Sequence, residues 1–153
     1  MYRVFEEKPE NFSPKISVAA CYIEVADQLL VLKRNKKSDQ GETWGVPAGK
    51  IEEGEESLDA TVREIFEETQ IKIEKSDLMS LGQLWIEIPK FQYIYYLSYV
   101  KFEKKPFLEL NKENTEYKWL NPEEIRKLNL IMGAEEALDL FLQRKGAVDV
   151  GKN

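Results

Sequence analysis

Short runs of apolar residues, each bounded by polar or turn-forming residues, recur along the chain and predict β-strands. Two such runs, residues 16–25 and 28–33, are rich in Val, Ile and Leu and lie close together in the sequence. A second pair, residues 78–88 and 91–102, is separated only by Pro-Lys. The last of these runs places tyrosines on both of its faces, which favours an interior strand of a sheet. Residues 116–120 predict one further strand.

Helical spacing, with apolar residues three or four positions apart, replaces this pattern over residues 57–69. We expect Ser57 to be the N-cap of this helix, because its hydroxyl can accept a hydrogen bond from a free backbone amide. Asn121 followed by Pro122 is typical of the start of another helix. A last helix is expected to begin near Gly133. Strands on both sides of one helix, followed by C-terminal helices, predict an α+β layered domain.

The chain contains no internal repeat and no low-complexity linker, and we expect a single domain over residues 1–153. A chain of this length buries about two-thirds of the surface that its unfolded form exposes. Residues 1–15 include two prolines and predict an extended arm or a short edge strand. Residues 146–153 are expected to form a loose tail.

The composition excludes several classes of active site. The chain has no histidine, which rules out histidine-based triads, imidazole zinc sites and histidine general bases. Its one cysteine, Cys21, lies in an apolar run and is expected to be a small buried hydrophobe. A single cysteine allows no intrachain disulfide, which agrees with a cytoplasmic protein.

Charge and hydropathy narrow the range of partners. Charged residues interrupt any apolar run near Met1, so no signal peptide is expected, and no stretch is long and apolar enough to span a membrane. The net charge of −6 disfavours nonspecific binding to nucleic acid. A phosphorylated small molecule stays compatible with this charge, because metal ions can offset it locally.

One side of the helix over residues 57–69 gathers three carboxylates. Glu64, Glu67 and Glu68 are separated by three, one and four positions, and they project within about 100° of one another. Like charges at these spacings weaken a helix by about 0.2–0.5 kcal/mol per pair, and a bound cation would relieve the repulsion. Mg²⁺ prefers oxygen ligands and shares its shell with substrate phosphates. The alternative is a solvated acidic face, but the preceding glycine loop and the adjacent Arg63 favour a metal site.

Residues 49–71, GKIEEGEESLDATVREIFEETQI, resemble the Nudix box, the motif of the Nudix (MutT-like) hydrolase family. The box reads Gly, five residues, Glu, seven residues, Arg-Glu, an aliphatic residue, one residue, Glu-Glu, one residue, Gly and an aliphatic residue. The matching positions are Gly49, Glu55, Arg63, Glu64, Ile65, Glu67, Glu68 and Ile71. Gln70 stands where the family has glycine. Residues 44–48 ahead of the box are also typical of the family, as is Glu116 ahead of Trp119.

The resemblance implies a fold, an activity and a cofactor. The fold would be an α/β/α sandwich, in which a mixed sheet lies between helices and the box forms a loop-helix-loop. The activity would be hydrolysis of the diphosphate linkage in a nucleoside diphosphate joined to another group, with Mg²⁺ or Mn²⁺ as cofactor. A nucleoside triphosphate, a nucleotide sugar and a dinucleoside polyphosphate are all candidate substrates. The alternative is a Nudix-fold module that binds nucleotides, or regulates, without hydrolysis.

The same resemblance assigns residues to a site. The metal ligands of the family match three glutamates, Glu64, Glu67 and Glu68. In the family a backbone carbonyl just before the box glycine often joins them, and here that carbonyl belongs to Ala48. Arg63 is expected to hold a neighbouring carboxylate through paired hydrogen bonds. The general base stays open between Glu64 and Glu116.

Three further residues between positions 49 and 71 lie outside the proposed set of ligands. We expect Glu55 to support the metal shell, whereas Glu52 is left open between that role and lining the turn. A glutamine at position 70 in a left-handed conformation would cost about 1 kcal/mol relative to glycine; the alternative is a helix that ends differently. Gln70 touches no proposed ligand, so we expect a small shift of the loop and retained metal binding.

Substrate contacts are less specific in the sequence. Arg34, at the end of a strand, is a candidate contact for phosphate, and Trp44 and Trp85 are candidates for stacking on a base. The alternatives are a solvated loop for Arg34 and a place in the core for either tryptophan. The N-terminal arm, residues 1–15, is a candidate surface for a homodimer.

Overall fold

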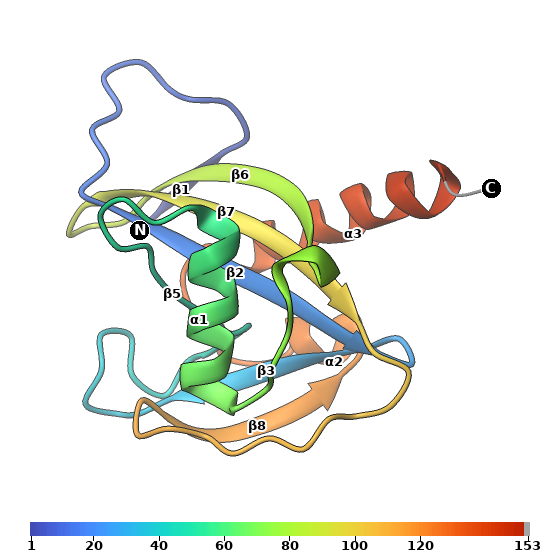
Figure 1. The fold of residues 1–153 in the computed structure, drawn as a ribbon. Coiled ribbons are helices and arrows are strands. Elements are labelled where there is room, and N and C mark those ends of the chain that lie inside the picture. The colour runs from blue at the N-terminus through green and yellow to red at the C-terminus, as the bar shows by residue number, and fades with distance from the viewer. Residues whose placement is uncertain (152–153) are drawn as a thin grey trace.

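The computed structural model describes the backbone of residues 1–151 and the side chains of residues 1–147. The strands in this part of the chain are β1 (Arg3–Phe5), β2 (Ile16–Val25), β3 (Gln28–Arg34), β4 (Trp44–Gly45), β5 (Ala48–Lys50), β6 (Met79–Glu87), β7 (Gln92–Lys101) and β8 (Asn114–Leu120). They form one mixed sheet with the order β1-β6-β7-β2-β3-β4 (Figure 1). β5 also pairs with β2, and β8 also pairs with β3.

Helices cover both faces of this sheet. They are α1 (Ser57–Thr69), the short 3-10 helix η1 (Lys75–Asp77), α2 (Pro122–Arg126) and α3 (Ala134–Gly151). In Figure 1, α1 lies in front of the sheet, and α2 and α3 lie behind it. Along β2, Tyr22 stacks on Phe141 of α3 with ring centroids 4.2 Å apart, whereas Cys21 and Ile23 share a buried cluster with Ile65 of α1. Alternate residues of one strand therefore face two helical layers, which confirms the α/β/α sandwich.

The sheet forks at β2. β7 lies in the sheet interior between β6 and β2, as its tyrosine pattern predicted, and runs parallel to β2. The other edge of β2 has two partners, with β5 opposite Val18–Ala20 and β3 opposite only Glu24 and Val25. β3 therefore diverges from β2 after a short stretch of pairing and continues alongside β8 and β4.

Residues with a left-handed backbone conformation follow two of these elements. Ala26 and Asp27, with φ angles of 49° and 65°, form the turn between β2 and β3. Gln70 ends α1 with φ 65° and ψ 8°, and its backbone amide donates to the carbonyl of Phe66. The box therefore keeps a left-handed helix end, although glutamine replaces the residue type that adopts it at the lowest cost.

Two predicted boundaries differ from the structure. Glu56 and not Ser57 is the N-cap of α1, because Glu56 keeps an extended backbone while Ser57 is already helical. The carbonyl of Ser57 accepts a hydrogen bond from Thr61 Oγ1 at 2.8 Å. α3 continues to Gly151, where we expected a loose tail, because no proline interrupts it after Lys145. Residues 152–153 lie outside the described residues.

The N-terminal arm contains β1, which pairs antiparallel with β6 at one edge of the sheet. The hydroxyl of Tyr2 donates to Glu136 of α3 at 2.9 Å, so the arm contacts both the sheet and a helix. A homodimer through this arm stays a prediction. Within residues 1–151, every helix is too short or too polar to cross a membrane.

Candidate active site

α1 directs its acidic side towards β5, the strand that carries Gly49. The carboxylate of Glu64 lies directly against this glycine, and a Cβ at position 49 would overlap it. The Glu64 side chain is 14% exposed, and this burial raises its pKa, although Arg63 opposes the shift. Glycine is therefore needed at position 49 for space, because it leaves a recess that the Glu64 carboxylate fills.

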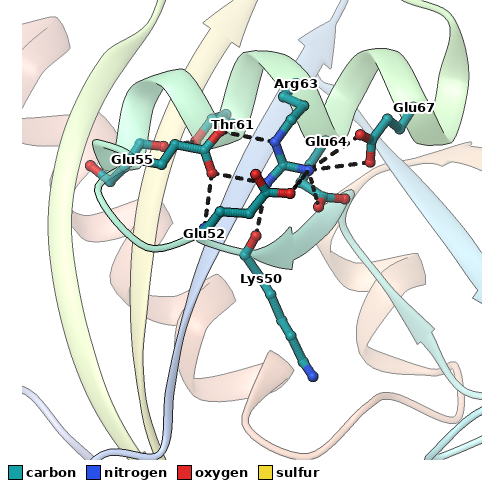
Figure 2. A network of polar contacts seen from close by, with 8 residues as sticks. Lys50, Glu52, Glu55, Thr61, Arg63, Glu64 and Glu67 are labelled. Atoms are coloured by element: carbon teal, nitrogen blue, oxygen red, sulfur yellow. Dashed lines mark hydrogen bonds and ion pairs between the residues drawn. The ribbon is translucent and has the colours of Figure 1, made fainter.

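Arg63 ties the loop before α1 to the acidic side of the helix (Figure 2). Its guanidinium makes two 2.9 Å hydrogen bonds to Glu55 and donates to the backbone carbonyl of Lys50 at 2.9 Å. It also donates to Glu64 at 2.8 Å and to Glu67 at 3.3 Å. These carboxylates raise the pKa of Arg63, so the group stays charged. The planar guanidinium thus fixes the loop and two glutamates relative to one another.

Both carboxylate oxygens of Glu55 bind Arg63. The paired bonds from Arg63, together with a 3.0 Å hydrogen bond from the backbone amide of Glu52, lower the pKa of Glu55 to about 2. The carboxylate of Glu52 lies 3.8 Å from the guanidinium and is 70% exposed. Glu55 therefore supports the box glutamates indirectly, by positioning the arginine that holds Glu64 and Glu67.

Glu68 is the buried member of the acidic set and is 4% exposed. Its Oε1 accepts from the backbone amide of Ala48 at 2.9 Å, and its Oε2 accepts from Asn114 Nδ2 at 3.3 Å. Burial raises the pKa of Glu68 to about 8, because these two hydrogen bonds offset the loss of solvent only in part. A positive partner is therefore required to favour the ionised form of this carboxylate at neutral pH.

The backbone of β5 brings a carbonyl to the same place. The carbonyl of Pro47 accepts from the amide of Cys21 on β2 at 3.0 Å. Because successive residues of a strand turn their backbone polar groups to opposite edges, both polar groups of Ala48 point away from β2. The amide of Ala48 bonds to Glu68, and its carbonyl therefore lies on the Glu68 side of the strand.

Oxygen donors of the kind that Mg²⁺ or Mn²⁺ prefers thus gather from α1 and β5. Among residues 1–147, however, no three acidic or thiol side chains lie close enough together to hold an ion. Arg63 lies between Glu64 and Glu67, and Glu68 faces Ala48 instead. The donors nevertheless fit a hard divalent cation, because all of them are oxygens and positive charge would favour the ionised form of the buried Glu68.

The two candidate bases differ in position. Glu64 lies in the recess beside β5, whereas Glu116, on β8, forms a 3.6 Å ion pair with a lysine of β3 and is 52% exposed. Glu113, in the loop before β8, is close enough that its charge contributes to raising the pKa of both Glu64 and Glu68. Sequence reasoning missed Glu113, because only the folding of this loop against α1 brings it to the site.

A cavity of about 380 Å³ opens next to these carboxylates. Glu68 and Ala48 form part of its wall, so the acidic site and the cavity are continuous. Most of the wall is apolar or aromatic and includes Tyr93 and Tyr95 of β7. Arg34, the predicted phosphate contact, also lines it. A concave, mainly apolar pocket with a few polar groups suits a small organic ligand.

The two tryptophans predicted to stack on a base do not line this cavity. Trp44 is 6% exposed in the core, and the ammonium of Lys118 lies 5.2 Å from the centre of its ring. Trp85 is opposite Phe5 in the pairing of β6 with β1. Its neighbour Ile86 lines the cavity, so alternation along β6 turns Trp85 to the other face of the sheet. The tyrosines of β7 are aromatic wall residues instead.

Comparison with known proteins agrees with this geometry. A family model described as NUDIX domain matches residues 14–141. Mouse nucleoside diphosphate-linked moiety X motif 6 is 38% identical over 77 residues, which are 49% of this chain and 24% of that protein. Phosphatase NudJ of Shigella boydii is 27% identical over 117 residues, which are 76% of this chain and 74% of that protein.

The matched region spans about a quarter of the length of the first curated relatives. Among solved structures, the MutT protein from Methanosarcina mazei Go1 has a TM-score of 0.73 and 22% identity, over 88% of this chain and 95% of that one. A likeness at that identity shows the fold. The family model covers most of the sequence, including the whole of α1 and its acidic side. The chain therefore belongs to the NUDIX domain family.

Proposed function

We propose that this protein is a Mg²⁺- or Mn²⁺-dependent hydrolase that cleaves the diphosphate linkage of a nucleoside diphosphate joined to another group. The observation that carries the proposal is the position of Glu68, which lies both on the acidic side of α1 and in the wall of the cavity. A ligand in the cavity therefore has one end beside the carboxylates. Membership of the NUDIX family supports the same class of reaction.

The divalent ion would be held by Glu64, Glu67 and Glu68 with the backbone carbonyl of Ala48. When bound, such an ion neutralises phosphate oxygens and lowers the pKa of a coordinated water. Glu67 is the proposed metal ligand with the weakest contacts to the protein. Its side chain is 53% exposed, and its hydrogen bonds to Arg63 are long, at 3.3 Å. Glu68 is held in place on both of its oxygens.

Proton transfer is assigned to Glu64. Its carboxylate lies beside the other proposed ligands and is only 14% exposed, which would place it within reach of a water bound to the ion. Arg63 keeps Glu64 in its recess against Gly49. Glu116 is the weaker candidate, because its side chain is 52% exposed, pairs with a lysine at 3.6 Å and does not line the cavity.

The cavity suits the organic part of a nucleotide. Tyr93 and Tyr95 contribute aromatic surface to its wall, and aromatic rings pack well against planar bases. Arg34 adds a permanent positive charge to the same wall, which suits phosphate. Nucleoside triphosphates, nucleotide sugars and dinucleoside polyphosphates all present these two chemistries.

The test is release of phosphate or nucleotide from a panel of nucleoside triphosphates, ADP-ribose, sugar nucleotides and dinucleoside polyphosphates, with Mg²⁺ or Mn²⁺. Glu67→Gln is compared with Glu53→Gln, which removes an exposed carboxylate from the loop before α1. Turnover that persists in the Glu53 variant and falls to background in the Glu67 variant supports the proposal. Ligand binding without turnover of any substrate favours a nucleotide-binding module instead.

A further inference from the structure

Two charged side chains from different loops meet at the cavity. Asp39 lies in the loop between β3 and β4, and Lys90 lies in the turn between β6 and β7. Lys90 Nζ donates to Asp39 Oδ1 at 3.0 Å, and both residues line the cavity. The side chain of Lys90 is 68% exposed, and that of Asp39 is 75% exposed. The pair therefore spans the solvent side of the cavity, which we call the cavity mouth.

Asp39 has more positive charge around it than one lysine. Arg34 Nε donates to the backbone carbonyl of Asp39 at 2.8 Å. The hydrogen bond and charge of Lys90, followed by the charges of Arg34 and Lys50, lower the pKa of Asp39. The side chain of Lys50 extends away from the Arg63 network (Figure 2), and Lys50 and Arg34 both line the cavity. Lys90 therefore contacts the Asp39 carboxylate directly, Arg34 holds its backbone, and Lys50 lines the same cavity.

This ion pair is not the only contact that holds the loop. Gln40 Oε1 accepts from the backbone amide of Met132 at 2.7 Å, and the backbone amide of Arg34 donates to the carbonyl of Thr43 at 2.9 Å. An ion pair as exposed as that of Asp39 and Lys90 contributes little to stability. The two side chains can therefore separate while the loop stays in place.

We propose that Asp39 occupies an anion site formed by Lys90, Arg34 and Lys50, and that a phosphate group of the substrate displaces it and binds Lys90. The identity of this anion, a diphosphate-bearing nucleotide, rests on the proposed function. Asp39 sets one negative charge against three cations, whereas a phosphate group brings more charge and more acceptor oxygens. Lys90 is then a substrate-binding residue, and Asp39 is its internal competitor.

The test is isothermal titration calorimetry with α,β-methylene-ADP, a nucleoside diphosphate that resists hydrolysis at this linkage, with Mg²⁺ present. Lys90→Gln is expected to weaken binding about tenfold, and Asp39→Asn is expected to tighten it about threefold. Lys37→Gln and Glu42→Gln are matched controls, because they remove charges from the same loop but outside the cavity wall. Screening by salt should keep their effects below about twofold.

Opposite signs for the two substitutions are the decisive result, because a purely structural ion pair would lose affinity with either one. Weaker binding by both variants, or unchanged binding by both, overturns the proposal. The proposal is also overturned if Asp39→Asn increases the affinity for adenosine as much as that for α,β-methylene-ADP. It is overturned as well if the parent protein binds neither α,β-methylene-ADP nor inorganic pyrophosphate. The measurement requires no turnover, so opposite signs in a protein without hydrolytic activity would retain the anion site and discard the proposed function.

Discussion

Removing either partner of the Glu24–Lys145 ion pair is expected to destabilise the protein, and by unequal amounts. Glu24, near the end of β2, is 3% exposed and accepts hydrogen bonds from Lys145 of α3 and Tyr99 of β7, each at 2.5 Å. Burial alone would raise the pKa of Glu24, but the hydrogen bonds from Lys145 and Tyr99 outweigh it and lower the pKa. The pair joins the sheet to the helix whose first turns line the cavity.

The burial of each partner sets the size of the loss. Lys145→Met leaves a carboxylate in a nearly closed site, and breaking a buried pair in this way costs about 3–5 kcal/mol. The side chain of Lys145 is 19% exposed, so we expect the lower end of that range, about 3 kcal/mol. Glu24→Gln leaves an ammonium group whose flexible stem can reach water, so we expect about 1–2 kcal/mol.

The loss is also expected to depend on pH. Because the folded-state pKa of Glu24 is lowered, its stabilisation is fully present above the ordinary value of 4.5 and is lost as the pH falls through the lowered pKa. Without Lys145, mainly the hydrogen bond from Tyr99 opposes burial, so the pKa of Glu24 rises relative to the parent and the difference in stability develops as the pH rises. The difference between the parent and Lys145→Met should therefore grow from about pH 3 to about pH 7.

Urea unfolding followed by tryptophan fluorescence measures these differences, with Lys104→Met as a control for loss of an exposed lysine. The double variant of Glu24 and Lys145 is expected to lose less than the sum of the single losses, because the two residues share one interaction. Equal losses in both single variants would refute the argument from burial. So would a loss in Lys145→Met that stays constant with pH.

Three further substitutions test the box itself. Gly49→Ala is expected to lower the free energy of unfolding by about 1–3 kcal/mol and to lower turnover, because its Cβ overlaps the Glu64 carboxylate. Thermal unfolding measures the first effect and a hydrolysis assay the second. Unchanged turnover would contradict the role of the recess. Arg63→Lys should lose about 1–3 kcal/mol in urea unfolding, because lysine cannot make the paired bonds to Glu55. Gln70→Gly should raise stability by about 1 kcal/mol in the same assay, and a loss would show that glutamine makes a compensating contact.

Local sequence was enough to predict most of the fold. The strand over residues 16–25 has the predicted ends, because its apolar run stops at a turn with left-handed residues. β5 was not predictable in this way. Its three residues, Ala48–Lys50, form a strand because β2 supplies backbone partners from a distant part of the chain. The predicted N-cap of α1 was wrong by one residue. Residue type favoured Ser57, but the backbone angles place Glu56 at the cap position.

The sequence predicted that the box glutamates lie on one side of a helix, but it did not predict the surroundings of each one. Spacing alone places the box glutamates on one side of a helix, but it does not distinguish Glu68 from the others. Contacts with Ala48 and Asn114, from two separate strands, make Glu68 the buried one. Alternation likewise shows that Trp85 and Tyr93 belong to strands, but the face that borders the cavity depends on how the strands are assembled.

The fork between β2 and β3 opens the sheet, so that the turn and loop that complete the cavity wall belong to other segments of the chain than the box glutamates. β3 leaves β2 after two residue pairs, and the turn at residues 88–91 and part of the loop at residues 35–43 complete the cavity wall. Neither segment belongs to residues 49–71, which carry the box glutamates and Arg63. Substitutions in the turn or the loop can therefore change which molecule fits without moving a carboxylate. If the proposed function holds, a lineage built on this scaffold can exchange its ligand while it inherits the same carboxylates unaltered.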